Sequence, residues 1–204
     1  MSKAAPKQTT DFGYEEVPIE EKQGRVRGVF DSVASKYDMM NDVMSGGLHR
    51  LWKNHMVGLL PLRNNVHLLD LAGGTGDISF RYLKRAHQAG VKVKATITDI
   101  NTSMLAEGQK RALNLNMSHY GEIEWREVNA EQIPFPDHSF DAVTIAFGIR
   151  NVTHIDKALA EIHRVLKPGG VFICLEFSPV ETPVLKEIYE IGRASCSERV
   201  CSVV

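Results

Sequence analysis

The sequence lacks several features that would place it in a specialised class of protein. Its three cysteines have neither metal-ligand spacing nor the even number that a disulfide framework needs. No apolar run approaches the roughly 18 residues of a membrane span, and residues 1–6 have no apolar core of the kind a secretory signal carries. A net charge of −1 gives no electrostatic reason to expect a nucleic-acid partner. The 204 residues therefore predict a cytoplasmic protein with one substantial core.

The most informative pattern lies in residues 66–77, VHLLDLAGGTGD. A short apolar run is followed by three glycines within the four residues 73–76, and a helix-periodic segment begins at Asp77. This pattern predicts a strand, a tight turn and a helix N-terminus, which is where α/β proteins hold a nucleotide-like ligand. Glycine suits such a turn because a Cβ atom would keep the backbone away from the ligand.

Two carboxylates flank this loop and indicate the kind of ligand. Asp70 ends the predicted strand and Asp77 opens the predicted helix. A dinucleotide site holds a pyrophosphate at the helix N-terminus, and two carboxylates there would repel it. S-adenosylmethionine carries a sulfonium and an ammonium and has no phosphate. We therefore predict a methyl-donor site, with Asp70, Gly73 and Gly74 among its contacts.

The rest of the chain alternates between the two periodicities, which predicts a doubly wound, mainly parallel α/β sheet. Strands are expected over 66–71, 91–99, 123–128, 141–147 and 171–177, with helices between them. A Thr153/Asp156 capping box is expected to start the last helix. The predicted divisions are a flexible arm (1–17), an N-terminal helical cap (18–62), a Rossmann-like domain (63–190) and a tail (191–204). The helical cap either covers the carboxyl edge of the sheet or is a packing helix pair.

Two polar residues at predicted strand ends are candidate ligand contacts. Asp99 lies 23 residues after Gly76, close to the ~20-residue offset at which an acid reaches a ribose hydroxyl. The alternative is that Asp99 caps the next helix. Asn129 follows the third predicted strand and precedes an apolar turn, an arrangement that suits an adenine ring.

Residues 30–189 resemble the ubiquinone/menaquinone biosynthesis C-methyltransferase family, which are class I S-adenosylmethionine-dependent enzymes. The glycine loop and RVLKPGG at 164–170 recur across many methyltransferases. The segments YDMMND, HRLWK and FGIRNVT, at 37–42, 49–53 and 147–153, are narrower and decide the family. The resemblance implies a Rossmann-like sheet of the class I methyltransferase type, lacking its last strands.

The resemblance also implies an activity and a set of cofactor contacts. The activity would be methyl transfer to a ring carbon of a polyprenyl benzoquinol or demethylmenaquinol. The family's cofactor positions match Thr75, Asp99, Asn129 and Ala130. A further position falls on Ala146, where relatives usually carry Ser. A backbone contact would survive that change and a hydroxyl contact would not.

Arg150, just past the fourth predicted strand, is the candidate catalytic residue. A ring carbon becomes nucleophilic when a neighbouring hydroxyl loses its proton, and a cation stabilises the resulting quinolate or organises a water. The alternative for Arg150 is a structural ion pair. Tyr37, His49 and Asn151 are expected to contact the substrate, and no metal is expected.

Three other functions remain open. One is a nicotinamide-dependent oxidoreductase with the same fold, and another is a methyltransferase acting on a different small acceptor. The third is a non-catalytic subunit that binds cofactor or prenyl lipid. A lipid substrate also leaves open a location peripheral to the inner membrane, at a membrane surface or in a quinone-biosynthesis assembly.

Residues 191–204 do not continue the family pattern and resemble a translated sequencing adapter. We expect that the natural chain continues for roughly another 60 residues, by analogy of domain size. Their loss would leave the fifth predicted strand as an exposed apolar edge.

Overall fold

The computed structural model describes residues 9–12, 15–18, 24, 25, 28, 47–176 and 201–203. Its main sheet has six strands in the order β5-β4-β3-β6-β7-β8. The strands are β3 (Val66–Leu71), β4 (Val93–Asp99), β5 (Glu122–Glu127), β6 (Phe140–Ala146), β7 (Leu166–Glu176) and β8 (Cys201–Val203). The helices beside it are α3 (Leu48–Gly58), α4 (Asp77–Gln88), α5 (Thr102–Asn114) and α6 (Ile155–Val165), with short 3₁₀ turns η2 (Met117–His119) and η3 (Ile149–Asn151).

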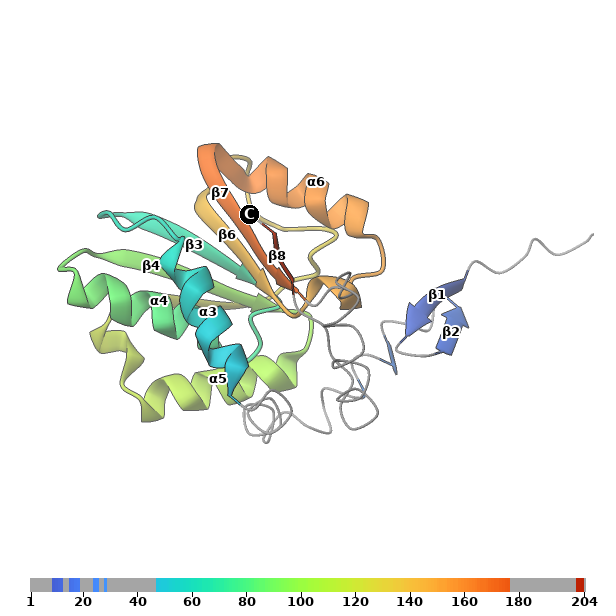
Figure 1. Ribbon diagram of the computed structural model, residues 1–204, viewed down its shortest axis with the longest axis horizontal. Coiled ribbons are helices and arrows are strands. Elements are labelled where there is room, and N and C mark those ends of the chain that lie inside the picture. Colours follow the sequence, from blue (N-terminus) through green and yellow to red (C-terminus); the bar gives the residue numbers. More distant parts are fainter. Residues whose placement is uncertain are drawn as a thin grey trace, which may run out of the picture.

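The five strands β3 to β7 pair in parallel, as the alternating pattern predicted. Successive side chains of a strand point to opposite faces, so Leu68 packs into one core cluster and Leu69 into another. Figure 1 shows α3 and α4 over one face of the sheet and α6 beside β7. The order reverses at β3, because the chain first builds outward to β5 and then returns to place β6 on the other side. The carboxyl ends of β3 and β6 therefore form a switch point, where such folds bind ligands.

The N-terminal region differs from the expected flexible arm. Residues Thr9–Phe12 (β1) and Glu15–Pro18 (β2) pair antiparallel as a separate two-stranded sheet. These segments contain threonine, valine and phenylalanine, which favour strands. Of the predicted helix that follows, residues 24, 25 and 28 are helical, and its other residues lie outside the described part of the chain.

The C-terminal edge of the sheet also differs from the expectation. β8 pairs antiparallel with Cys174, Leu175 and Glu176 of β7. The expected bare edge is therefore wrong for these three residues, because a strand from the 191–204 segment covers them. None of the helices in the described ranges is long and apolar enough to cross a membrane.

Helix α3 lies in the predicted helical cap and buries a face that is partly polar. His49, Lys53, Met56 and Val57 are buried, whereas Leu48, Leu51 and Leu59 are 52%, 64% and 43% exposed. The spacing of Leu48, Leu51, Trp52, Met56 and Leu59 predicts an amphipathic helix, and of these apolar residues Met56 is on the buried face. The buried face is fixed by core contacts of Met56 and Val57 and by the pairing of Lys53 with a carboxylate of α4.

The start of α6 is capped by a residue from another loop. The Glu131 carboxylate accepts hydrogen bonds from the backbone N–H groups of Thr153, at 3.0 Å, and His154, at 3.1 Å. The helix begins at Ile155, and its N-cap His154 makes no side-chain cap hydrogen bond. The predicted capping box is therefore wrong, because Glu131 accepts the Thr153 N–H that the Asp156 side chain was expected to bind.

Candidate functional site

A cavity opens at the carboxyl ends of the strands of the main sheet. Its wall comes from the loops that follow β3, β4, β5 and β6, with one residue from α3. The lining residues are Lys53, Asp70 to Thr75, Asp77, Ile78, Asp99 to Asn101, Met104, Val128 to Glu131, Ala146 to Gly148 and Asn151 to Thr153. The switch point predicted from strand order is thus where the cavity lies.

The glycine loop between β3 and α4 forms one wall of the cavity. Gly74 and Gly76 have φ angles of +51° and +81°, which side chains rarely adopt. A Cβ atom on Gly74 would lie 3.0 Å from Met104 Cε and 3.7 Å from Asp99 Oδ2. A side chain at this position would therefore press against Met104 and contact Asp99, which both line the cavity.

Asp99 lies at the end of β4 and faces the cavity. Its Oδ2 accepts a hydrogen bond from the Gly74 N–H at 3.0 Å, and its Oδ1 accepts one from the Asn101 N–H at 2.8 Å. Burial raises the pKa of Asp99, and these backbone donors partly oppose the rise. The cap of α5 is Asn101, whose side chain accepts from the Met104 N–H. The helix-capping alternative for Asp99 is therefore wrong.

The other two carboxylates of the loop have opposite environments. Asp70 is fully buried and accepts from Ser79 Oγ at 2.7 Å and Thr144 Oγ1 at 2.8 Å. Burial raises the pKa of Asp70 to about 6, although both hydroxyls lower it. It therefore ties β3 to α4 and β6 as well as lining the cavity.

Asp77 is surrounded by cations. Burial tends to raise its pKa, but Lys53, Arg81 and Arg111 hold that pKa down at about 2. The nearest atoms of these three cations lie 3.0, 3.2 and 3.5 Å from its oxygens. The expected repulsion of phosphate by the pair of carboxylates is thus weaker than the sequence implied, because Asp77 is more than neutralised.

The positions expected to hold an adenine ring also line the cavity. Val128 is buried, and Asn129 and Ala130 follow it at the end of β5. The Asn129 side-chain oxygen accepts from the Glu131 N–H at 3.0 Å, which fixes the turn. Thr75 and Ala146 line other parts of the same cavity. The cofactor positions implied by the family resemblance are therefore brought together in one cavity.

Two non-glycine residues at the cavity have positive φ angles, Ala72 at +50° and Phe147 at +55°. They follow the central strands β3 and β6. A Cβ atom on the neighbouring Gly148 would lie 2.6 Å from Ala72 Cβ. Such conformations cost about 1–3 kcal/mol each and tend to occur at ligand sites. The backbone is thus tightly fitted between these two strand ends.

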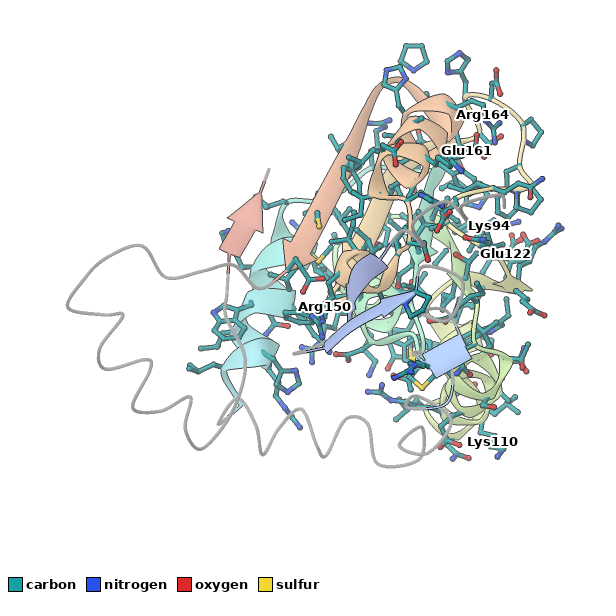
Figure 2. The ribbon with its side chains drawn as sticks, turned by 90° about the vertical axis from the view of Figure 1, so that its right-hand side faces the viewer. Lys94, Lys110, Glu122, Arg150, Glu161 and Arg164 are labelled. Atoms are coloured by element: carbon teal, nitrogen blue, oxygen red, sulfur yellow. The ribbon has the colours of Figure 1, made fainter. Side chains whose placement is uncertain are left out.

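The residues expected to serve catalysis and substrate binding do not all line the cavity, unlike the expected cofactor contacts. Asn151 lines the cavity, but Arg150 and His49 are not among the lining residues in the described ranges. The Arg150 guanidinium pairs with the Glu176 carboxylate, and its side chain is 41% exposed. Figure 2 shows Arg150 well away from the Glu161–Arg164 pair of α6. His49 is buried on α3, and Tyr37 lies outside the described residues.

Lys53 is the site residue that the sequence reasoning missed. It is 5% exposed, lines the cavity and pairs with Asp77. A signal was present, because Lys53 lies three and four residues before Met56 and Val57, which share one helix face. No group of three or more His, Cys, Asp or Glu residues that could hold a metal was found in the described part of the chain.

The comparison with protein-family models decides the identity. The model described as the ubiE/COQ5 methyltransferase family matches residues 18–197. The chain belongs to this family. The match continues past residue 190, where the family pattern was expected to end, and so includes the first part of the 191–204 segment.

Relatives in the ubiE/COQ5 family are similar over most of the chain. A protein of Rhodopseudomonas palustris (strain HaA2) is 56% identical over 189 residues, which are 91% of this chain and 73% of that protein. One from Hydrogenovibrio crunogenus is 51% identical over 184 residues, 90% of this chain and 70% of that protein. Both are named ubiquinone/menaquinone biosynthesis C-methyltransferase UbiE.

Solved structures support the fold. The [4+2]-cyclase SpnF is 24% identical with a TM-score of 0.64, covering 79% of this chain and 62% of that one. An S-adenosylmethionine-dependent methyltransferase from Aquifex aeolicus is 21% identical with a TM-score of 0.55, covering 64% of this chain and 66% of that one. At such identities the likeness shows the fold alone, and that fold is the predicted Rossmann-like α/β sheet.

Proposed function

We propose that this member of the ubiE/COQ5 family is an S-adenosylmethionine-dependent C-methyltransferase of ubiquinone/menaquinone biosynthesis, with its donor site in the cavity between β3, β4 and β6. Membership of the family is the evidence for methyl transfer as the class of reaction. The observation that carries the location is the meeting of Thr75, Asp99, Asn129 and Ala130 in one cavity. The acceptor that we propose is a polyprenyl benzoquinol or demethylmenaquinol.

The residues of the cavity fit the donor. Asp99 offers carboxylate oxygens to ribose hydroxyls, because each oxygen accepts one backbone N–H and retains further lone pairs. Val128 and the turn at Asn129 and Ala130 supply the apolar and polar contacts that an adenine ring needs. The space beside Gly74 admits the ligand because that residue has no side chain. When bound, S-adenosylmethionine supplies an electrophilic methyl group.

Arg150 is our candidate for activating the acceptor. It follows β6 and precedes Asn151, which lines the cavity, and Glu176 at the end of β7 holds its guanidinium. In this role the guanidinium would stabilise a quinolate oxygen as the acceptor hydroxyl loses its proton. Orienting the acceptor and the donor relative to one another accounts for most of the remaining acceleration.

The test is a methyl-transfer assay with tritium-labelled donor and two acceptors, a demethylmenaquinol and a polyprenyl benzoquinol precursor, each in detergent micelles. We expect label in the acceptor ring, with the ratio of the two rates identifying the preferred ring. Binding of S-adenosylhomocysteine with no label in either quinol would contradict the proposal. That result would favour methylation of another acceptor or a non-catalytic binding subunit.

We also propose that the enzyme is cytoplasmic and acts at an anionic bilayer surface through the outer face of α3, the stripe formed by Leu48, Leu51 and Leu59. These leucines are exposed, and the basic residues Arg50 and Arg63, from α3 and from the loop that follows it, are exposed as well. Basic side chains around apolar ones complement a surface of anionic lipid headgroups. The opposite face of the same helix carries a cavity residue, so binding through the stripe would bring the cavity within about one helix diameter, roughly 10 Å, of the lipid.

A further inference from the structure

Lys53 is in an unusual position for a lysine. It is 5% exposed, and lysine is rarely buried unless it is paired. It comes from α3, outside the βα loops that form the rest of the wall, yet it lines the cavity. Among the described residues that line the cavity, it is the single basic one. Whatever anionic group enters this cavity therefore meets Lys53.

Lys53 belongs to a cluster of ion pairs centred on Asp77. Asp77 is the anion of the cluster, and three cations surround it: Lys53 at 3.0 Å, Arg81 at 3.2 Å and Arg111 at 3.5 Å. Arg111 also donates to Thr75 Oγ1 at 3.4 Å, so the cluster is continuous with the glycine loop. A carboxylate from a ligand placed beside the Lys53 ammonium would accept a charge-assisted hydrogen bond here.

The ammonium of Lys53 retains donors for such a group. An ammonium has three N–H donors, and within the described ranges Asp77 is the acceptor recorded for it. The pairing with Asp77 fixes the direction of the side chain, so little rotamer freedom remains to be lost on ligand binding. Asp77 is thus a positioning residue for Lys53.

We propose that Lys53 binds the α-carboxylate at the amino-acid end of the methyl donor, while Asp99 binds the ribose. The inference rests on the proposed function, which supplies the donor. That donor carries one carboxylate and no phosphate, and the cavity wall carries one basic residue. The one carboxylate of the donor would pair with the Lys53 ammonium, which Asp77 orients. This pairing assigns the amino-acid end of the ligand to the α3 side of the cavity.

The first test uses the unaltered chain and three ligands in calorimetric titrations. S-adenosylhomocysteine has the carboxylate, its methyl ester replaces that charge with a neutral group one methyl larger, and 5′-methylthioadenosine lacks the amino-acid end. We expect the ester to bind about 10–100-fold more weakly than S-adenosylhomocysteine, which is the range for a hydrogen bond to a charged group. Equal affinity for the ester and the acid would overturn the assignment.

The second test uses variants and follows the ratio of two affinities. Lys53→Met should weaken S-adenosylhomocysteine binding about 10–100-fold and leave 5′-methylthioadenosine binding within about twofold. Lys53→Arg should restore most of the loss, because it keeps the charge. Lys110→Met, at an exposed lysine of α5, is the matched control and should change neither affinity. An unchanged ratio in Lys53→Met would overturn the proposal.

The double variant Lys53→Met/Asp77→Asn separates attraction by Lys53 from repulsion by an exposed Asp77. We expect the double variant to bind S-adenosylhomocysteine as weakly as Lys53→Met. Recovery to the unaltered affinity would mean that Lys53 only screens Asp77, and the assignment would fall. If the unaltered chain binds neither 5′-methylthioadenosine nor S-adenosylhomocysteine, the proposed function fails. If it binds both ligands and the ratio of the two affinities is the same in Lys53→Met, only this inference fails.

Discussion

Asp70 and Asp77 show how strongly surroundings decide what a carboxylate does. Asp70 receives two hydroxyl hydrogen bonds, and burial raises its pKa to about 6. Asp77, at the other end of the same loop, receives three cations that hold its pKa at about 2 against the effect of burial. The sequence presents them as a symmetric pair, but the fold makes one a buried structural anchor and the other an ion-pair centre.

The raised pKa of Asp70 predicts a pH dependence of stability. Between about pH 4 and pH 6 the folded chain holds a proton on Asp70 that the unfolded chain has released, so stability falls as pH rises through this window. The variant Asp70→Asn does not titrate. Its free energy of unfolding, measured by urea titration, should therefore rise relative to the unaltered chain by about 2–3 kcal/mol between pH 4.5 and pH 7.5.

Asp77→Asn is the contrasting control. The lowered pKa of Asp77 makes its contribution to stability present above about pH 4 and lost as pH falls toward 2. The difference in free energy of unfolding between Asp77→Asn and the unaltered chain should therefore stay constant between pH 4.5 and pH 7.5. A constant difference for Asp70→Asn as well would show that burial does not destabilise the charged form of Asp70.

Arg150 gives a second prediction at this scale. If its guanidinium stabilises the quinolate, Arg150→Ala should lower kcat about 10²–10³-fold, the range for losing one group that stabilises developing charge. The Kd of S-adenosylhomocysteine should change less than threefold, because Arg150 does not line the donor cavity. Arg126→Ala, at an exposed arginine paired with Glu124 on β5, is the control and should keep full turnover. Equal losses in kcat and cofactor affinity would contradict the role.

At the scale of elements, the close approach of two strand ends makes a steric prediction. Gly148→Ala would place a methyl group 2.6 Å from Ala72 Cβ, at the carboxyl ends of β6 and β3. Overpacking of this kind costs about 1–3 kcal/mol, which for a chain of this size lowers the Tm by about 2–4 °C per kcal/mol. S-adenosylhomocysteine binding should weaken too, because both residues belong to the cavity wall.

Gly58→Ala is the matched control for that substitution. Gly58 is the last residue of α3, and a Cβ atom there has nothing within 4 Å. Its Tm should stay the same or rise slightly, because alanine is the better helix former. A Tm for Gly148→Ala as high as that of Gly58→Ala would show that the two strand ends separate without cost.

The leucine stripe of α3 predicts how the chain meets a bilayer. Leu51→Glu should reduce co-sedimentation with anionic phospholipid vesicles several-fold, because a charge replaces the most exposed residue of the stripe. Leu113→Glu, at an 81% exposed leucine of α5, should leave vesicle binding unchanged. Equal binding by both variants would exclude the stripe as the contact surface.

The positions of strands and helices were predictable because they depend on local periodicity. Strands β3, β4, β5 and β6 begin and end within two residues of their predicted bounds. Burial and capping that depend on residues far away in the sequence were not predictable. Lys53 is buried because Asp77, 24 residues away, receives it, and Glu131, 22 residues away, caps Thr153. The same limit explains the site: the motif located Asp99 and Asn129, whereas Lys53 reaches the cavity only through packing of α3.

At the scale of the whole molecule, strand order makes the site. Residues between 53 and 153 meet in one cavity because the order reverses at β3 and gathers four loops at one edge. The chain spans 73% of its R. palustris relative. The residues that line the cavity in the described ranges run from Lys53 to Thr153. We therefore expect the donor cavity to bind its ligand in the chain as given.

The most direct test of the account is calorimetric titration of the chain with S-adenosylhomocysteine and, separately, with NADH. We predict one-site binding of S-adenosylhomocysteine, weakened about 10-fold or more in Asp99→Asn, because an amide nitrogen cannot accept the hydrogen bonds that the carboxylate accepts. NADH should give no heat of binding at the same concentrations. Binding of NADH without S-adenosylhomocysteine would contradict a methyl-donor site and identify the cavity as a dinucleotide site.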